Sequence, residues 1–176
     1  MILISAGHYP RKPGGGCNPA LDINEHRECV GIVDCIEAEI KRDSRFDYKR
    51  VPIGTLSSKV KWINQQQDVD ISVEVHLNAF NGEADYGCSL YLSEKGKRAA
   101  GFINEYMQRY LPFRKFHKMP MERPLAFLKD TRPVSVIVEP LFADNGTMAR
   151  YLLHPRSHDI IGRAIYLGIK KYLLLT

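Results

Sequence analysis

Apolar residues along the chain follow two patterns, short continuous runs and longer stretches with apolar residues three or four positions apart. Short runs rich in β-branched residues are typical of buried strands. They predict strands at 2–5, 50–53, 70–78, 87–92, 125–128 and 135–139. The run 70–78 is the densest in β-branched residues, so we expect it to lie centrally in a sheet.

The second pattern predicts helices that bury one face. Asn24 precedes the first of them and is a residue type that caps helices. The inward residues are expected to be Cys29, Ile32, Val33, Ile36 and Ile40 after Asn24; Val60 and Ile63 in 57–67; Phe102, Ile103, Tyr106, Met107 and Tyr110 in 95–111; and Ile161, Ala164, Ile165, Ile169 and Tyr172 in a last helix that begins near Pro155.

Strands and helices therefore alternate along the whole sequence. This alternation predicts an α/β fold, a twisted, mostly parallel or mixed sheet with helices on both faces. With 176 residues, no internal repeat and no linker, the chain is expected to form a single domain, 1–176.

Composition excludes several classes of protein. Hydrophobic residues make up 44% and charged residues 26%, which excludes a disordered chain. The net charge of +5 favours an anionic partner. A single Trp and no recognisable reading motif disfavour nucleic acid. No apolar run approaches the roughly 18 residues of a membrane span, so membrane insertion is not expected.

The N-terminal apolar run is short and lacks a basic segment, and Gly7-His8 interrupts it. We therefore predict no export signal, and synthesis in the cytoplasm. The four cysteines form no C-x-x-C pair and are expected to be ordinary reduced thiols.

Four metal-competent or acidic side chains lie where predicted strands end or helices begin. His8 follows the first strand, Glu25 opens the first helix, His76 ends the central strand and Glu139 ends a late strand. Functional residues of α/β sheets gather at such positions. Two imidazoles and one carboxylate are a common ligand set of catalytic Zn²⁺, and a further carboxylate would serve as general base.

Each residue also has a structural interpretation. A histidine at a strand end usually satisfies hydrogen bonds, and Glu25 suits the first turn of a helix. Glu139 is harder to explain in this way, because a carboxylate after apolar strand residues is expensive to desolvate. The spacing of the four matches no short metal motif, so the residues alone leave both interpretations open.

Several segments resemble the zinc-dependent N-acetylmuramoyl-L-alanine amidases of the Amidase_3 type. The opening ILISAGH of 2–8, with the glycine-rich run to Gly16, is similar to the start of that family. Three more matches are Asn24-Glu25-His26, VHLNA at 75–79, and VIVE at 136–139 followed by Phe142 and Asn145. The end of the chain, 164–172, resembles the last helix of the family, so the resemblance runs from residue 2 to about 173.

The resemblance implies that His8, Glu25 and His76 are Zn²⁺ ligands and that Glu139 is the catalytic carboxylate. The implied reaction is hydrolysis of the amide between the lactyl group of N-acetylmuramic acid and L-alanine of the peptidoglycan stem peptide. Pro140 and Leu141 depart from the usual residues after the catalytic glutamate.

Other polar residues carry weaker signals. Glu28, one turn from Glu25, is the alternative ligand. Asn78 and Lys129 are candidate substrate-binding residues by position alone. Four other histidines have no motif support: His26, His117, His154 and His158.

Two loop segments also contain glycine-rich or basic runs. The run 11–16 lacks the close of a P-loop and is expected to be a flexible approach to the site. The basic run 114–118 could touch an anionic wall polymer, although a solvated loop is the favoured interpretation.

The sequence thus predicts a monomeric peptidoglycan hydrolase that acts on the cell wall, similar to the catalytic domain of a phage endolysin. Two other functions stay open. One is a zinc peptidase that cuts within the stem peptide, and the other is a wall-binding protein that has kept the fold and lost catalysis.

Overall fold

The computed structural model describes residues 1–12, 14–113, 115–116 and 119–176. Its strands are β1 (Ile2–Ala6), β2 (Tyr48–Arg50), β3 (Ile71–Val75), β4 (Tyr86–Tyr91), β5 (Lys115–Phe116), β6 (Met121–Glu122) and β7 (Ser135–Glu139). Its helices are α1 (Glu25–Asp43), α2 (Leu56–Asn64), α3 (Glu94–Tyr110), α4 (Ala126–Asp130), α5 (Gly146–Leu152) and α6 (Ser157–Leu174), with a 3-10 turn at Pro19–Leu21.

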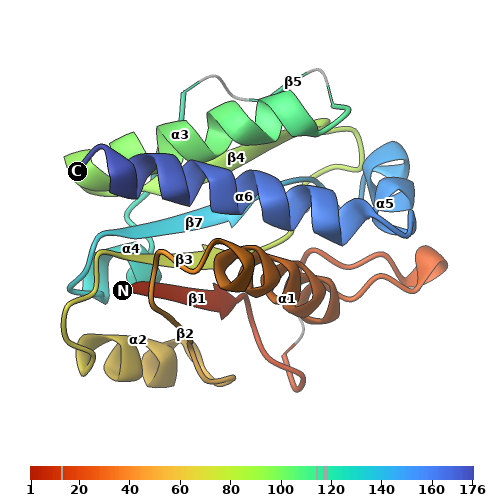
Figure 1. Cartoon of the computed structure of the whole chain (residues 1–176). Helices are drawn as coiled ribbons and strands as arrows, with labels where there is room; N and C mark the ends of the chain where they lie inside the picture. The colour runs from red at the N-terminus through yellow and green to blue at the C-terminus, as the bar shows by residue number, and fades with distance from the viewer. Residues whose placement is uncertain (13, 114, 117–118) are drawn as a thin grey trace.

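The strands form one mixed sheet in the order β2-β1-β3-β7-β4-β5, and β6 pairs with β4 (Figure 1). Strands β2, β1, β3 and β7 run parallel, whereas β4 is antiparallel to β7. The predicted α/β fold is confirmed, including the central place of β3. Because β1, β3 and β7 are parallel neighbours, their carboxyl ends open on the same edge of the sheet.

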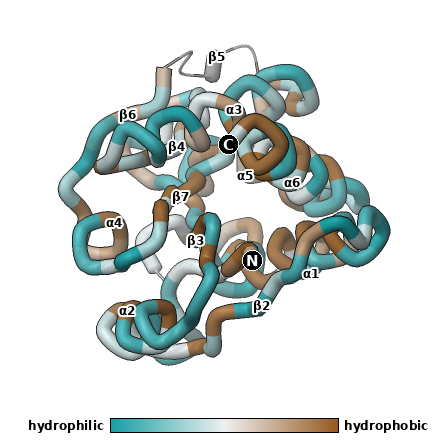
Figure 2. Tube along the Cα trace, turned by 60° about the vertical axis from the view of Figure 1, so that its left-hand side comes forward, coloured by the Kyte–Doolittle hydropathy of each residue, from teal (hydrophilic) through white to brown (hydrophobic). Residues whose placement is uncertain are grey.

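Helices cover both faces of this sheet, as Figure 2 shows for α1 and α6 on one side and α2 and α4 on the other. Alternation along β1 assigns its side chains to the two layers: Ile2 and Ile4 pack in the core with α1, α3 and α6, whereas Leu3 packs with α2 and α4. None of the helices in the described part of the chain combines the length and hydropathy needed to cross a bilayer.

Several predicted details were wrong. Residues 125–128 were predicted as a strand, but Ala126–Asp130 is the short helix α4, because four apolar residues do not distinguish one helical turn from a strand. Helix α5 was not predicted. The second strand lies at Tyr48–Arg50 rather than 50–53. Tyr110, predicted to face inward, is 38% exposed.

The phase of α2 also differs from the prediction. Ile63 is buried as expected, but Val60 is only partly buried. The other buried side chain of α2 is Lys59, which is 4% exposed. A lysine is almost never fully buried without a partner, so α2 must contact a compensating group beneath it.

The closest approach between α3 and α6 depends on Gly168. A Cβ atom at this position would come within 2.4 Å of Ile103 Cα, whereas a Cβ at Gly101 of α3 would meet no atom within 4 Å. The Gly168→Ala substitution is therefore expected to lower the free energy of unfolding by about 1–3 kcal/mol through overpacking. Gly101→Ala, the matched control, is expected to raise it by about 0.4–1 kcal/mol. Denaturant unfolding of both variants tests this packing, and equal stabilities would contradict it.

Candidate metal centre

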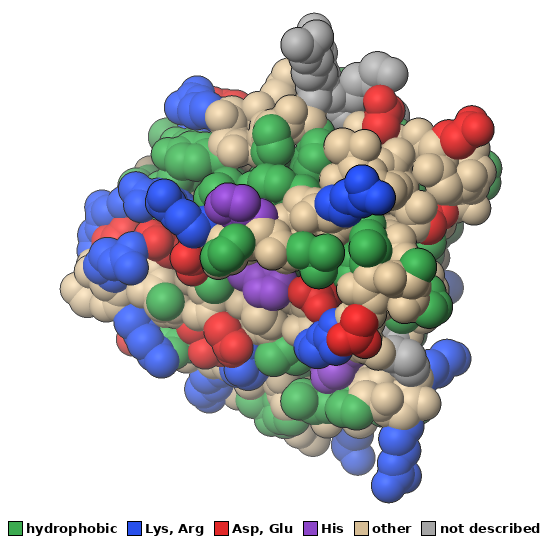
Figure 3. Space-filling model, turned by 90° about the vertical axis from the view of Figure 1, so that its right-hand side faces the viewer, with side chains coloured by type: hydrophobic (Ala, Val, Ile, Leu, Met, Phe, Trp, Pro, Cys, Tyr) green, Lys and Arg blue, Asp and Glu red, His purple; other side chains and the backbone are tan. Residues whose placement is uncertain are grey.

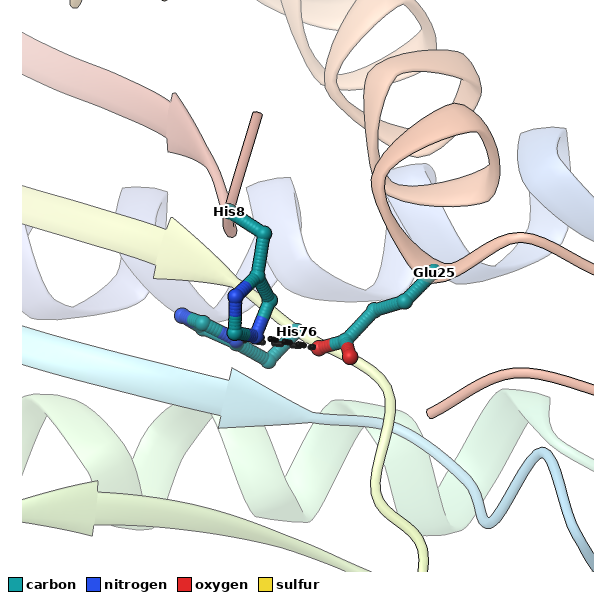
Figure 4. Close-up of side chains that lie close together, drawn as sticks. All are labelled: His8, Glu25 and His76. Carbon is teal, nitrogen blue, oxygen red and sulfur yellow. Dashed lines mark hydrogen bonds and ion pairs between the residues drawn. The ribbon is translucent and has the colours of Figure 1, made fainter. Parts of the chain in front are cut away.

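Three predicted residues meet at the carboxyl edge of the sheet. Figure 3 views the molecule from the side toward which β1 points in Figure 1, and histidine and acidic side chains are visible on that face. His8 follows β1, His76 follows β3, and Glu25 is the first residue of α1. Figure 4 shows both rings close to the Glu25 carboxylate.

The distances between these side chains are short enough for all three to bind one metal ion. His76 Nδ1 lies 3.0 Å and His8 Nε2 lies 3.3 Å from Glu25 Oε1. The ring centroids of the two histidines are 4.9 Å apart, with an interplanar angle of 83°. One ligand atom from each of the three residues lies within 4.8 Å of the others. This is the only such cluster among the described residues.

The backbone around His8 is shaped for this convergence. His8 itself has φ 56°, in the left-handed region that non-glycine residues rarely adopt. A Cβ at Gly7 would come within 2.5 Å of His76 Nδ1. Only glycine therefore lets the end of β1 approach the His76 ring this closely.

The glycine-rich loop also packs on the site. Gly14 has φ +105°, and a Cβ there would meet Glu25 Oε2 at 2.1 Å. The Gly16 amide donates to the same oxygen over 2.8 Å. The predicted approach loop 11–16, of which residue 13 lies outside the described residues, therefore helps to hold Glu25.

Glu25 is an anion fixed by hydrogen bonds. It is 1% exposed, and its Oε1 also accepts the Leu77 amide over 3.1 Å. Burial alone would raise its pKa, but hydrogen bonds from His76, His8 and Gly16 outweigh burial and lower the pKa to about 2. The site therefore presents an ionised carboxylate at every physiological pH.

His76 lies between two carboxylates. Its Nε2 is 2.9 Å from Glu74 Oε1, on the opposite side of the ring from Glu25. Burial lowers the pKa of His76, but the hydrogen bonds to Glu25 and Glu74 outweigh burial and raise the pKa to about 9. The cluster itself offers one buried carboxylate and two imidazoles, an N, N, O donor set that Zn²⁺ takes in catalytic sites.

Glu139 ends β7 in an adjoining cavity of about 240 Å³. Asn78 Nδ2 donates to Glu139 Oε2 over 2.7 Å, and the Cys88 thiol donates to the same oxygen over 3.4 Å. Burial raises the pKa of Glu139. Both of these donors are directed to Glu139 Oε2.

Asn78 is held in turn by the segment after β7. The backbone N–H of Asn78 donates to the Leu141 carbonyl over 2.9 Å, and the backbone carbonyl of Asn78 accepts the Ala143 N–H over 2.8 Å. Leu141 is fully buried. Pro140 and Leu141 differ from the residues that usually follow the catalytic glutamate in the family. The parallel pairing nevertheless continues beyond the ends of β3 and β7.

A second cavity, of about 470 Å³, opens beside the histidines. His8, His76 and Lys59 line it together with apolar side chains, and Leu125 lines both this cavity and the one at Glu139. His8 and His76 therefore line a cavity that shares Leu125 with the cavity at Glu139, and Glu25 lies buried behind the two rings.

Two other predicted residues line neither of these cavities. Glu28 Oε2 is 2.9 Å from His158 Nε2 and its Oε1 is 3.1 Å from Arg27 Nε, so this carboxylate joins α1 to α6. Lys129 is exposed on α4 and lines neither the cavity beside the histidines nor the one at Glu139. Its contact with substrate stays a prediction.

The other histidines that the structure describes lie outside the cluster. His26 Nδ1 is 2.9 Å from the Gly7 carbonyl, and His154 Nδ1 accepts the Arg156 amide over 3.2 Å. His117 and most of the basic run 114–118 lie outside the described residues.

Sequence reasoning missed Glu74 and Lys59, which form a buried ion pair with Nζ 2.8 Å from Oε2. One signal was present: Glu74 interrupts the apolar run of β3 two residues before His76, and alternate residues of a strand share a face. The phase of α2 concealed the partner, because Lys59 occupies a position expected to be polar and exposed.

Comparison with known families decides the relationship. The family model described as N-acetylmuramoyl-L-alanine amidase, Amidase_3, matches residues 2–171. The chain belongs to the N-acetylmuramoyl-L-alanine amidase family. Comparison with curated protein sequences gives no match.

Solved amidase structures share the fold of this family member. The CwlD amidase from Clostridioides difficile, solved in complex with the GerS lipoprotein, has a TM-score of 0.88 and 21% identity, over 99% of this chain and 98% of that one. The catalytic domain of CwlV from Bacillus (Paenibacillus) polymyxa var. colistinus has a TM-score of 0.86 and 16% identity, over 99% and 98%. The catalytic domain of the CD27L endolysin, which targets Clostridia difficile, has a TM-score of 0.76 and 22% identity, over 97% and 96%.

The raised pKa of Glu139 predicts how stability depends on pH in this amidase-family chain. The folded state holds the Glu139 proton to a higher pH than the unfolded state, so this group lowers stability as pH rises above its ordinary value near 4.5. Glu139→Gln removes that ionisation. In metal-stripped protein the variant is expected to be more stable than wild type at pH 7, with the difference shrinking as pH falls toward about 4.5 and largely gone below it. Denaturant unfolding across this range is the measurement, and a pH-independent difference would contradict the assignment.

Proposed function

We propose that the chain is a peptidoglycan hydrolase that cleaves the amide between the lactyl group of N-acetylmuramic acid and L-alanine of the stem peptide. The observation that carries the proposal is the convergence of His8, Glu25 and His76 in a member of the amidase family, with Glu139 lining the adjoining cavity. The whole chain, 1–176, is proposed to be the catalytic domain, acting on the cell wall as a monomer.

His8, Glu25 and His76 are proposed to hold one Zn²⁺. When bound, Zn²⁺ supplies Lewis-acid polarisation of the amide carbonyl and makes water more acidic. Glu25 contributes the anionic ligand, since its low pKa keeps it ionised. Its contacts with the Gly16 and Leu77 amides hold the carboxylate in place before any ion arrives.

Glu139 is proposed to be the general base and acid. It accepts a proton from the attacking water, whose oxygen bonds to the lactyl carbonyl carbon, and it returns this proton to the L-alanine nitrogen as the C–N bond breaks. The donors Asn78 and Cys88 orient the carboxyl through Oε2. Burial raises the pKa of Glu139, which brings it closer to the range in which a carboxyl both accepts and releases a proton.

Anionic wall polymers are the proposed partner. The net charge of +5 favours such a polymer, and the cavity beside the histidines offers apolar walls for the uncharged parts of a muropeptide. Asn78 is proposed to contact substrate in addition to Glu139, because it lines the same cavity.

Glu139→Gln is expected to lower hydrolysis of purified peptidoglycan by about 10²–10⁴-fold, because the side chain no longer transfers a proton. The variant should bind Zn²⁺ as wild type does. Glu28→Gln, the same exchange in a buried carboxylate outside the site, is the control and should retain activity. Hydrolysis by the Glu139 variant at the wild-type rate would assign the base to another residue.

The products separate the proposal from its rivals. A free muramic lactyl carboxylate and a new amino terminus on L-alanine support the amidase. A new amino terminus beyond L-alanine would show a peptidase that cuts within the stem. Failure of wild-type protein to release any product, with or without added Zn²⁺, would leave the wall-binding function.

A further inference from the structure

A buried polar cluster lies behind His76, on the side of the sheet covered by α2. It consists of Glu74 on β3, Lys59 on α2 and Ser5 on β1. Glu74 is 3% exposed, Lys59 4% and Ser5 0%. The hydrogen bonds of these three side chains go to one another, to the Ala6 carbonyl and to His76, so the cluster lies apart from Glu25 and Glu139.

The contacts between the members of the cluster converge on Glu74. Lys59 Nζ lies 2.8 Å from Glu74 Oε2 and also donates to the Ala6 carbonyl. The Ser5 hydroxyl donates to the same Oε2 from the neighbouring strand, where Ser5 pairs with Glu74 in register. Oε2 is therefore held by two donors, which leaves Oε1 to accept from His76 Nε2 over 2.9 Å.

Fold stability does not explain the cluster. Removing a lysine and a glutamate from water costs several kcal/mol per ion, and apolar residues of similar volume often stabilise a core as well or better. The same layer contains Leu3, Ile63 and Ile137, so apolar packing is available to this sequence at the site. The contact that apolar residues could not replace is the one to His76.

We propose that Glu74, held by Lys59 and Ser5, is a positioning residue that fixes His76 with Nε2–H toward Glu74 and Nδ1 toward the metal. A carboxylate that accepts the second N–H of a ligating imidazole fixes its tautomer and makes the other nitrogen a better ligand. Nδ1 is the nitrogen that faces Glu25, so the orientation agrees with the proposed centre. The inference rests on the proposed function, because it requires that His76 binds the ion.

The variants are chosen to separate positioning from folding. Glu74→Gln alone leaves Lys59 without a counter-ion in the core, so it is paired with the double variant Glu74→Gln/Lys59→Met, which buries no charge. Glu28→Gln is the matched control, since Glu28 also lies 2.9 Å from a histidine Nε2 but outside the site. The measurements are the Zn²⁺ dissociation constant by chelator competition, the visible spectrum of the Co²⁺-substituted protein, and unfolding of the metal-stripped protein.

The double variant is expected to bind Zn²⁺ about 10–100-fold more weakly than wild type and to show an altered Co²⁺ spectrum. The Glu28 variant should keep both properties. Wild-type Zn²⁺ affinity in a folded double variant would overturn the positioning role and leave the metal centre intact. A His76→Ala variant that binds Zn²⁺ as tightly as wild type would instead contradict the proposed metal centre. It would contradict this inference as well.

The protonation of the His76 ring can also be measured directly in wild-type protein. This measurement does not depend on whether a variant folds. In Zn²⁺-loaded, ¹⁵N-labelled protein, the His76 ring is expected to carry its proton on Nε2, with Nδ1 showing the shift of a metal-bound nitrogen. A proton on Nδ1 and a metal-bound Nε2 would overturn the inference.

Discussion

Convergence of parallel strand ends on one buried anion is the constraint on which the site depends. The Glu25 carboxylate is removed from solvent at the start of α1, and its charge is balanced by two imidazoles and two backbone amides from separate segments. Together these donors outweigh burial and hold the pKa of the carboxyl at about 2. The parallel register of β1, β3 and β7 provides this, because it brings their carboxyl ends to one edge.

The layer beneath this edge is polar where apolar packing would suffice for folding. Lys59, Glu74 and Ser5 occupy the interface between the sheet and α2, directly behind His76. Glu139 is a comparable case on β7, where burial keeps its pKa raised. Burial of either carboxylate lowers the stability of the fold. Glu74 contacts His76, and Glu139 lines the cavity that adjoins the histidines. Stability and function are thus opposed in the same few residues.

The sequence predicted the parts of the molecule that depend on local pattern and on a general rule of topology. The apolar runs of β1, β3 and β7 gave their positions, and the rule that polar residues at strand ends meet at one edge brought His8, Glu25 and His76 together. The helix α4 was misassigned because four apolar residues carry no usable period. Glu74 and Lys59 were missed because their pairing joins a strand to a helix, and no local pattern in the sequence records how those two elements pack. Lys129 was included by position alone, and the turn of α4 directs it to solvent.

Anomalous diffraction at the zinc edge, from crystals grown with one equivalent of Zn²⁺, tests the central claim most directly. We expect a single strong peak about 2.0–2.2 Å from one nitrogen of His8, one nitrogen of His76 and an oxygen of Glu25. A peak at other residues, or imidazoles that turn away from each other around an empty site, would contradict it.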